Sequence, residues 1–567
     1  MNHLLGKATN PDFWNEVREK PCFEQHRKAL AEMWKNDCNK DLIPALRYSD
    51  YKQYWITGDR KAYERNYFSR RRALECSAIL SLVYPEDEQY LTYLNDVIFA
   101  VCNEYSWCLP AHQGKLEPIN ETMLDLFACE TGFALSETYH LLGDRLDPLI
   151  RNRIRAEIDR RIVTPFTAVD NYGGWENGTA NWTAVCMGSI ACTMMLMRPE
   201  LVDESLLTRF NASMNRYLSG FLDDGICLEG CGYWYYGFGF FTVYADMVRK
   251  FTEGKVDYFK LEKVSKVAQF IQNSMLNEKI SISFADGGGT FSYHTGIIHY
   301  LKDQYPTLVN VYDPCYSSDK NPDSCARFCL YLRSFTWLNE DYYNNPTPID
   351  SDAEYYAEVS QWLIKRNANY GFAAKGGCNA EPHNHNDVGA FIFAKDGQQA
   401  ITDLGAGLYT RQYFAAATRY TIIENSSRSH SVPIVDGELQ ILGRDARATD
   451  VQYKDGIFSM NIAAAYGKSD VMRIDRSFAF TSDSVTLTDE YEFAGEHSIV
   501  ERLTSRIEPQ IAEDGKIILG STTVTYDPTV CTCQISSEPT SPNPNKLCYM
   551  IDFKLNDGVK KFSCTVR

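Results

Sequence analysis

The sequence predicts a helical domain followed by an antiparallel β-sandwich. Apolar residues recur at helical spacing up to about residue 340, and they alternate with polar residues beyond about residue 353. A length of 567 residues also exceeds one ordinary hydrophobic core, which favours two to four domains. We therefore expect a helical domain over 1–343, a linker over 344–352 and a β-sandwich over 353–567.

Helical periodicity is clearest in two segments of the first part. One apolar stripe recurs at positions i, i+3, i+4, i+7 and i+11: Val264, Val267, Ala268, Ile271 and Met275. The segment 127–143, FACETGFALSETYHLLG, ends on Gly143, which predicts a helix with a glycine C-cap. Many such helices in series, separated by short Gly, Pro or Asn loops, predict a helical bundle or a toroid.

The pattern changes at NNPTPIDSD, where Pro346 and Pro348 would break a helix. Beyond this stretch, an Asp-Gly turn precedes alternating apolar residues over 458–462, and residues 485–493 alternate in the same way. The runs KIILG and TTVTY also have the character of strands. Short strands with turn signals between them, and without helical segments, predict an antiparallel sandwich.

Composition excludes several classes of protein. The 74 acidic residues outnumber the 57 basic ones, and the net charge of −17 has the wrong sign for a general nucleic-acid binder. We find no uncharged apolar run of the roughly 18 residues that a membrane helix needs, so we expect neither a nucleic-acid nor a membrane partner. The 36 Tyr and 9 Trp residues suit sugar-binding clefts, although a rigid aromatic core would also use them.

The expected location is the cytoplasm. The opening MNHLLGKATNPDFW lacks the apolar stretch of a signal peptide, and the 18 cysteines show no paired CxxC clusters, which favours reduced buried thiols. A periplasmic or secreted protein is the alternative if a leader has been removed. The sequence leaves the oligomeric state open.

The segment 378–405, CNAEPHNHNDVGAFIFAKDGQQAITDLG, holds candidate metal ligands. His383 and His385 lie two positions apart, which on a strand would place both imidazoles on one face. Asp403 follows a predicted hairpin that would return its carboxylate beside them. His430 adds another imidazole, and imidazoles with one carboxylate are a ligand set for zinc, with manganese as an alternative. A polar turn hydrogen-bonded to the backbone is the competing interpretation.

The segment 170–188, DNYGGWENGTANWTAVCMG, interrupts the helical spacing and leads into a helix near Trp182. Asn181 has two interpretations there. Its amide could cap the helix, or it could hydrogen-bond a substrate carboxylate and favour the neutral, enolisable form of that group. Trp107 and His112, in SWCLPAHQGK, are candidates for a cleft wall.

The segment 223–240, DDGICLEGCGYWYYGFGF, places aromatic residues after closely spaced glycines, which predicts a loop that exposes rings to a cleft. Tyr233, Tyr235 and Tyr236 each carry a phenol. A phenol becomes a proton shuttle when cationic neighbours or a metal lower its pKa from about 10. Aromatic packing is the alternative for each of them.

Together, these segments resemble the heparinase II/III family of polysaccharide lyases. Four patterns occur in the family's order: the NW pair at Asn181 and Trp182, DGxxxEGxGYWxYG at 224–237, HNHND…D at 383–403 and NSSRSHSVPIVDG at 425–437. The resemblance covers about residues 100 to 440. It implies an incomplete (α/α) toroid followed by an antiparallel β-sandwich, and cleavage of uronic-acid polysaccharides by β-elimination.

The resemblance also implies roles for individual residues. Asn181, helped by His383, would neutralise the uronate carboxylate. Tyr233 would protonate the leaving C4 oxygen, and it would also remove the C5 proton when both lie on one face of the sugar. His383 would be the base when they lie on opposite faces. Three residues match the family's metal-binding positions: His385, Asp403 and His430. A metal there, zinc with manganese or calcium as alternatives, would order the edge of the sandwich.

Substrate-binding side chains are expected around these groups: Trp107, His112, Trp182, Tyr236 and Arg411. Tyr236 lies close enough to Tyr233 in sequence to exchange roles with it. The ANWT segment lacks the histidine that some relatives place beside the asparagine, so fewer groups would neutralise the carboxylate.

The predicted function is a uronate-specific lyase acting on hyaluronan, chondroitin sulfate or heparan sulfate, with alginate as the nearest competing substrate. Two alternatives come from other classes. One is a metal-dependent hydrolase in which the predicted metal site activates water. The other is a non-catalytic glycan-binding protein on the same scaffold.

Overall fold

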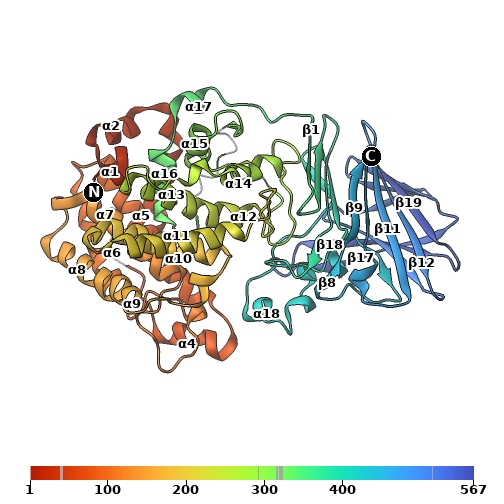
Figure 1. The fold of residues 1–567 in the computed structure, drawn as a ribbon, viewed down its shortest axis with the longest axis horizontal. Coiled ribbons are helices and arrows are strands. Elements are labelled where there is room, and N and C mark those ends of the chain that lie inside the picture. Colours follow the sequence, from red (N-terminus) through yellow and green to blue (C-terminus); the bar gives the residue numbers. More distant parts are fainter. Residues whose placement is uncertain (1, 39–42, 291–292, 314–316, 318–322, 514) are drawn as a thin grey trace. The chain divides into compact units, whose positions relative to one another are not determined.

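A computed structural model describes residues 2–38, 43–290, 293–313, 317, 323–513 and 515–567. Helices occupy the chain up to Asn344, and the named strands begin at Ala353, as the colour sequence in Figure 1 shows. This order confirms the predicted succession of a helical part and an antiparallel β part. Among the described residues, the helices are too short or too polar to cross a bilayer.

The helices of the first part have the following bounds: α1 (Asn2–Leu5), α2 (Pro11–Glu19), α3 (Glu24–Asp37), α4 (Tyr48–Thr57), α5 (Lys61–Val83), α6 (Glu88–Cys102), α7 (Leu126–Leu142), α8 (Pro148–Ile158), α9 (Thr164–Thr167), α10 (Asn181–Met197), α11 (Glu204–Ser219), α12 (Cys231–Tyr233), α13 (Gly239–Phe251), α14 (Glu262–Asn273), α15 (Thr295–Gln304), α16 (Phe328–Thr336) and α17 (Glu340–Asn344).

Besides short 3₁₀ turns, the described residues of the second part form one α-helix, α18 (Arg411–Phe414), and these strands: β1 (Ala353–Ala357), β2 (Trp362–Arg366), β3 (Gly371–Lys375), β4 (Cys378–Asn379), β5 (Phe391–Lys395), β6 (Gln398–Ile401), β7 (Ile434–Val435), β8 (Gly443–Arg447), β9 (Thr449–Lys454), β10 (Ile457–Asn461), β11 (Val471–Phe480), β12 (Val485–Phe493), β13 (Ile499–Ser505), β14 (Gln510–Glu513), β15 (Lys516–Leu519), β16 (Thr522–Tyr526), β17 (Cys531–Pro539), β18 (Leu547–Leu555) and β19 (Lys561–Val566).

The chain divides into two compact units, and each is described by itself. The helical unit comprises Met1–Gly220, Tyr235–Ser265 and Ser292–Pro348. The β unit comprises Phe221–Trp234, Lys266–Phe291 and Ile349–Arg567. Two segments from the helical part of the sequence therefore belong to the β unit. The predicted domain ranges stay a prediction.

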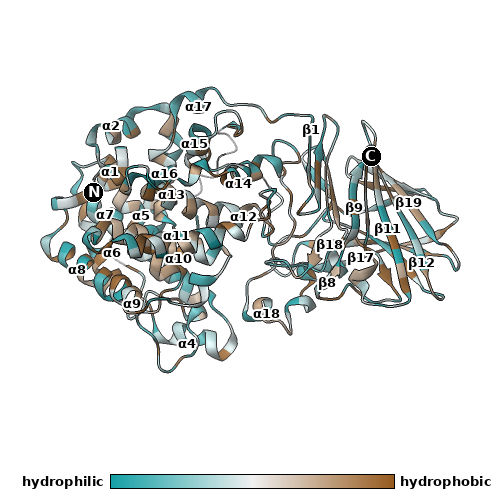
Figure 2. Cartoon of the chain, in the orientation of Figure 1, coloured by the Kyte–Doolittle hydropathy of each residue, from teal (hydrophilic) through white to brown (hydrophobic). Residues whose placement is uncertain are grey.

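The helical unit is built around α10, which packs against α7, α11 and α13. This helix is apolar on all sides, so it is buried around its whole circumference. Brown residues gather on the inner helices around α5, α7 and α10 in Figure 2. The predicted helix over 127–143 is α7, and Gly143 follows it with a φ of 52°. The predicted stripe from Val264 to Ile271 lies in α14, and Met275 falls beyond its end.

The β unit holds three larger antiparallel sheets. Their strand orders are β1-β2-β3-β5-β6, β14-β15-β16-β19-β12-β11-β10-β9 and β17-β18-β13-β7, and β4 pairs with β8. Inward side chains from the three larger sheets form one hydrophobic core. Strand β12 shows the predicted alternation, because Val485, Leu487 and Tyr491 are buried between more exposed neighbours. The predicted strands at 458–462, KIILG and TTVTY correspond to β10, β15 and β16.

Candidate active site

A buried carboxylate, Asp286, receives four hydrogen bonds in the β unit. Its Oδ2 accepts from the Tyr409 hydroxyl at 2.8 Å and lies 2.5 Å from Nδ1 of His383. Its Oδ1 lies 3.2 Å from Nε2 of His385 and accepts from the Tyr413 hydroxyl. Burial alone would raise the pKa of Asp286, but the hydrogen bonds from the two histidines hold it well below its usual range. The carboxylate is therefore an acceptor that fixes the direction of four donors.

Tyr233 and His383 lie side by side beside this carboxylate. Their ring centroids are 4.3 Å apart, and the Tyr233 hydroxyl lies 2.9 Å from the Tyr409 hydroxyl. Because the single hydroxyl hydrogen of Tyr409 is used in its hydrogen bond to Asp286, the Tyr233 hydroxyl must be the donor to the Tyr409 oxygen. The phenol and the imidazole are thus both oriented by Asp286, one of them through Tyr409.

The loop that carries His383 differs from the prediction. His383 and His385 do not lie on a strand; they lie in the irregular loop between β4 and β5, and His383 has a positive φ of 53°. Their imidazoles still converge, because they reach the two oxygens of the same carboxylate. Nε2 of His383 lies 3.5 Å from Oε2 of Glu229, whose pKa is raised by burial.

Close backbone approach explains Gly230, three positions before Tyr233. Gly230, at φ 96°, precedes α12, and a Cβ there would lie 2.7 Å from the Cα of Gly287. A Cβ on Gly405, at φ 66°, would lie 2.0 Å from the carbonyl oxygen of the same Gly287. Only glycine allows these segments to meet beside Asp286. The first glycine of the EGxGYW pattern therefore has a structural reason.

A second group of buried side chains adjoins this network through His385. His385, Asp403 and His430 each offer a ligand atom, and these atoms lie within 4.8 Å of one another. The hairpin of β5 and β6 returns the chain to Asp403, as predicted. Nδ1 of His385, Oδ2 of Asp403 and Nδ1 of His430 are buried without a well-formed hydrogen bond among the described residues. Two imidazole nitrogens and one carboxylate oxygen left in this state fit a metal ion.

Charge interactions and hydrogen bonds set the charge and orientation of Asp403 and His430 in this candidate metal group. Oδ2 of Asp403 lies 3.0 Å from Nδ1 of His430. Burial opposes both charged forms, but this contact prevails, and it lowers the pKa of Asp403 and raises that of His430. Nε2 of His430 donates to the Glu424 carbonyl at 2.9 Å, so its Nδ1 faces the site. These three side chains can hold a metal.

Asn181 belongs to the helical unit. Helix α10 begins at Asn181, the N-cap position is Ala180, and no side-chain cap bond forms there. The interpretation of Asn181 as a helix cap is therefore wrong. Its side chain is buried, and none of the side-chain hydrogen bonds in the described part of the chain uses its amide. A Cβ on Gly237 would lie 2.7 Å from the Tyr217 hydroxyl and 3.1 Å from the Cβ of Asn181, so glycine at 237 leaves room for both residues.

Two of the predicted substrate-contacting aromatics, Trp182 and His112, pack against each other in the helical unit. The rings of Trp182 and His112 are 4.8 Å apart, and Nδ1 of His112 lies 2.7 Å from Oδ2 of Asp125. Trp107 differs from the prediction, because it is 1% exposed and its indole donates to the Val101 carbonyl. Its ring packs in the core and offers no face to a sugar.

The aromatic run after Tyr233 is helical, not a loop. A π-helix covers Trp234–Phe238 and leads directly into α13. The Tyr236 hydroxyl donates to Oε1 of Glu130 at 2.5 Å, and the guanidinium of Arg327 lies 3.8 Å from the centre of its ring. The pKa of Tyr236 is raised by burial and by Glu130. Tyr235 stacks on His294.

Arginines near the network have different surroundings. Arg411 opens α18 and is exposed. Arg419 donates to the carbonyls of Asn384 and Tyr413, and its guanidinium lies 3.8 Å from Asp286. Arg419 therefore supports the loop that carries His383.

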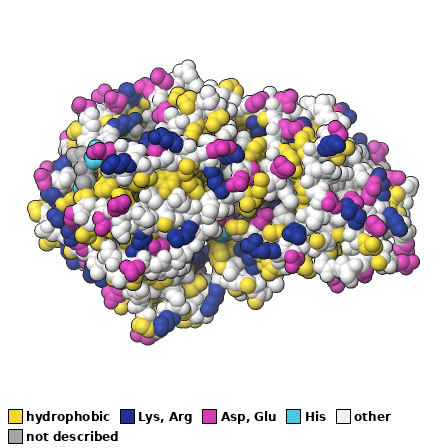
Figure 3. Space-filling view, in the orientation of Figure 1, with side chains coloured by type: hydrophobic (Ala, Val, Ile, Leu, Met, Phe, Trp, Pro, Cys, Tyr) yellow, Lys and Arg dark blue, Asp and Glu magenta, His cyan; other side chains and the backbone are white. Residues whose placement is uncertain are grey.

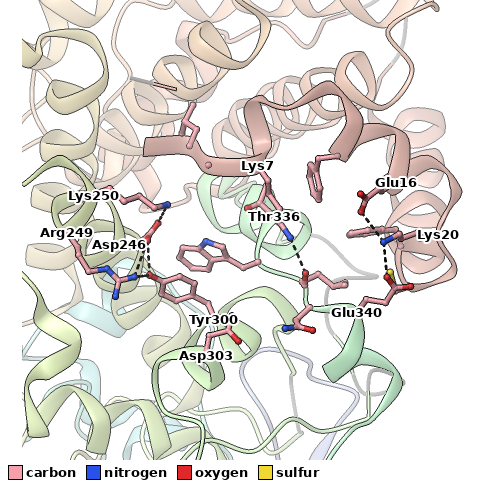
Figure 4. A pocket seen from close by; sticks show the side chains of 18 residues that line it. Lys7, Glu16, Lys20, Asp246, Arg249, Lys250, Tyr300, Asp303, Thr336 and Glu340 are labelled. Carbon is pink, nitrogen blue, oxygen red and sulfur yellow. Dashed lines mark hydrogen bonds and ion pairs between the residues drawn. The ribbon is translucent and has the colours of Figure 1, made fainter. Parts of the chain in front are cut away.

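A cavity of about 570 Å³ in the helical unit is a separate feature (Figure 4). Its lining contains internal ion pairs: Asp246 binds Lys250 at 2.7 Å and Lys20 binds Glu340 at 2.8 Å. Acidic and basic side chains are likewise interspersed over the face of the molecule in Figure 3. We infer no polyanion site from either surface.

Comparison with solved structures identifies the fold. Heparinase III aligns with a TM-score of 0.64 at 13% identity over 100% of this chain and 88% of that chain. A heparan sulfate lyase HepC mutant from Pedobacter heparinus aligns at 0.60 and 12%, over 100% and 87%. The chondroitin AC lyase of Streptomyces coelicolor A3, in complex with chondroitin sulphate, aligns at 0.56 and 10%, over 98% and 82%.

The chain has the fold of these lyases. This confirms the predicted architecture of an incomplete (α/α) toroid followed by an antiparallel β-sandwich. No family model and no curated protein matches the sequence.

Sequence reasoning missed four residues of the network: Glu229, Asp286, Tyr409 and Tyr413. Glu229 was visible as the acidic member of the EGxGYW pattern. Asp286 stands in FADGGG, which signals only a turn, and the two tyrosines stand in GLYTRQYF, which resembles ordinary aromatic packing. No local spacing relates these segments to His383.

Proposed function

We propose that the chain is a polysaccharide lyase that cleaves uronic-acid-containing polysaccharides by β-elimination. The observation that carries the proposal is the pairing of the Tyr233 phenol with the His383 imidazole, 4.3 Å apart and both oriented by Asp286. The fold shared with three lyases supports it. In the reaction the C5–H and C4–O bonds break and a C4=C5 double bond forms.

Each step has a candidate group. Asn181 supplies an amide donor to the uronate carboxylate, and His383 assists, so that the C5 proton becomes more acidic. Tyr233 gives a proton to the leaving C4 oxygen. It also removes the C5 proton when the two lie on one face of the ring, and His383 does so when they lie on opposite faces. Trp182, His112 and the exposed Arg411 would contact the sugar chain.

The proposed substrates are glycosaminoglycans. The compared structures are named for heparan sulfate and chondroitin, so these two are the first candidates, with hyaluronan and alginate as further members of the panel. The partner would be an acidic polysaccharide or oligosaccharide. Since none of the described cysteines forms a disulfide, we also propose a reducing compartment, the cytoplasm.

We propose zinc as the metal of His385, Asp403 and His430. Two imidazoles favour zinc over calcium, which prefers oxygen ligands, and manganese is the alternative. When bound, the ion would cross-link the loops that carry these residues. The hydrolase alternative needs the ligand set to be reached by substrate and water, whereas the three side chains are at most 2% exposed. The burial of this group therefore favours a structural metal.

One assay separates the three classes of function. The protein is incubated with heparan sulfate, chondroitin sulfate, hyaluronan and alginate, and the ultraviolet absorbance of an unsaturated uronyl end is followed. A lyase produces this band, a hydrolase produces reducing ends without it, and a binding protein produces neither. Absence of the band on every member of the panel would overturn the proposal.

A further inference from the structure

The two oxygens of Asp286 serve different groups in the β unit. Oδ1 faces Nε2 of His385 at 3.2 Å, and Oδ2 faces Nδ1 of His383 at 2.5 Å and the Tyr409 hydroxyl at 2.8 Å. The side chain is fully buried, so water does not replace any of these partners. One carboxylate therefore lies between the metal-binding group and the pair formed by Tyr233 and His383.

The Oδ1 side has the geometry of support for a metal ligand. A histidine that binds a metal through one nitrogen commonly donates its other N–H to a carboxylate, which fixes the tautomer and the ring orientation. Nε2 of His385 faces Asp286, while its Nδ1 is buried without a hydrogen-bond partner among the described residues. Asp286 thus holds His385 with Nδ1 turned toward Asp403 and His430.

The Oδ2 side orients the two groups that would perform the elimination. Because Oδ2 of Asp286 engages Nδ1 of His383, the other ring nitrogen, Nε2, faces away from Asp286 and lies 3.5 Å from Oε2 of Glu229. Oδ2 of Asp286 accepts the hydroxyl hydrogen of Tyr409 and so fixes its direction. Tyr233 in turn donates to the Tyr409 oxygen. A carboxamide at position 286 would present an N–H to one of these sides, where the structure requires an acceptor.

We propose that Asp286 is a positioning residue that couples the metal group to the catalytic pair, so that metal affinity and turnover depend on the same carboxylate. The catalytic half of this inference rests on the proposed lyase function. The metal half does not. Asp286 acts through His385 on one side and through Tyr409 and His383 on the other.

The test compares Asp286→Asn with Asp552→Asn in the full chain. Asp552 also belongs to the β unit and loses an Arg502 ion pair on substitution, but it lies outside the Asp286 network. Zinc affinity is measured without substrate, by competition with a chromophoric chelator. We expect Asp286→Asn to bind zinc about 10- to 100-fold more weakly, and Asp552→Asn to bind it as the wild type does.

The second readout is turnover in the lyase assay with saturating zinc. We expect Asp286→Asn to lower kcat by about 100-fold with little change in KM, because misorientation affects the reacting groups more than the binding surface. Tyr409→Phe is expected to lower kcat while leaving zinc affinity unchanged, since Tyr409 contacts Oδ2. This variant separates the two sides of the carboxylate.

Three results would overturn the inference: unchanged zinc affinity in Asp286→Asn, unchanged kcat in Asp286→Asn, or weakened zinc binding in Tyr409→Phe. Circular dichroism checks the fold of each variant. If Asp286→Asn does not fold, wild-type protein stripped of metal must show a lower kcat at similar KM, restored by zinc, and an unaltered kcat would overturn the coupling. A wild type without unsaturated products removes the lyase proposal and the catalytic half, while the zinc measurement still decides the metal half.

Discussion

Each unit of the molecule holds a tyrosine tied to a buried carboxylate, but the two ties differ. In the helical unit, the Tyr236 hydroxyl donates directly to Glu130, and Arg327 covers its ring. In the β unit, Tyr233 is linked to Asp286 through the Tyr409 hydroxyl. Tyr236 is 7% exposed, whereas Tyr233 is only half-buried.

The difference teaches which phenol is available for chemistry. The Tyr236 phenol donates its hydrogen bond directly to a buried carboxylate, which raises its pKa and leaves its hydroxyl hydrogen committed to that partner. Tyr236 therefore holds helices together. The Tyr233 phenol donates instead to another hydroxyl, and its side chain is half-buried. The imidazole of His383 lies beside this phenol, with ring centroids 4.3 Å apart. We therefore propose that Tyr233 transfers the proton and that Tyr236 has a structural role.

The largest expected effect is on turnover. Tyr233→Phe should lower kcat by about 10² to 10⁴, because it removes the group that we propose as the proton donor. Tyr236→Phe should leave kcat near that of the wild type and lower stability by about 1–3 kcal/mol, since Glu130 loses its donor in a buried site. The measurements are the absorbance assay and urea unfolding, with Tyr453→Phe on β9 as a matched control. An inactive Tyr236→Phe beside an active Tyr233→Phe would reverse the assignment.

Asn181 gives the next largest effect. Asn181→Ala should lower kcat/KM by about 10² to 10³ through loss of a donor to the substrate carboxylate. Stability should change little, because the amide makes no hydrogen bond in the described part of the chain and caps no helix. Gly237→Ala would crowd both the Tyr217 hydroxyl and the Asn181 side chain without removing either, and we expect a smaller loss of activity. Full activity of Asn181→Ala would exclude this residue from the reaction.

The extent of prediction from sequence follows from the range of each signal. The helical period of α14 and the alternation of β12 arise from neighbours in the chain, so they were visible. The set of His385, Asp403 and His430 came from the resemblance and from an expected hairpin. The strand proposed for His385 was wrong, because this residue lies in the loop between β4 and β5. Its imidazole contacts the buried Asp286, and its backbone does not pair in a sheet.

The network around Asp286 had no such local signal. His383 and Asp286 are 97 positions apart in sequence, and Tyr233 and Tyr409 are 176 apart. Contacts of this range depend on how distant segments pack, and a single sequence does not encode them as a spacing. Trp107 shows a different limit of prediction. A tryptophan side chain is of a type that suits a sugar-binding cleft, but the fold buries Trp107 in the core.

Glu130 predicts a pH-dependent stability that the Asp286 network does not share. Burial, only partly offset by Arg327, raises the pKa of Glu130 from 4.5 to about 7, and Tyr236, Asp323 and Asp125 are its other polar or charged neighbours. The folded chain therefore holds this proton up to about pH 7, whereas the unfolded chain loses it near pH 4.5.

Stability should accordingly fall as the pH rises through this window, by about 3 kcal/mol in total. Glu130→Gln carries no such proton, so urea unfolding of the two proteins at pH 5 and pH 8 should show a larger loss in the wild type. An equal dependence on pH in both would assign the effect to other groups.

The metal group supplies the smallest effect and the sharpest distinction between the units, because only the β unit contributes His385, Asp403 and His430. An ion at about 100 times its Kd stabilises the fold by about 2.7 kcal/mol, so a chelator should lower the Tm and zinc should restore it. Hydrogen exchange should show lower protection in 378–405 and 425–437 after metal removal, with α10 unchanged. Equal loss of protection in α10 would mean that the metal stabilises the whole chain, and the two units would then unfold together.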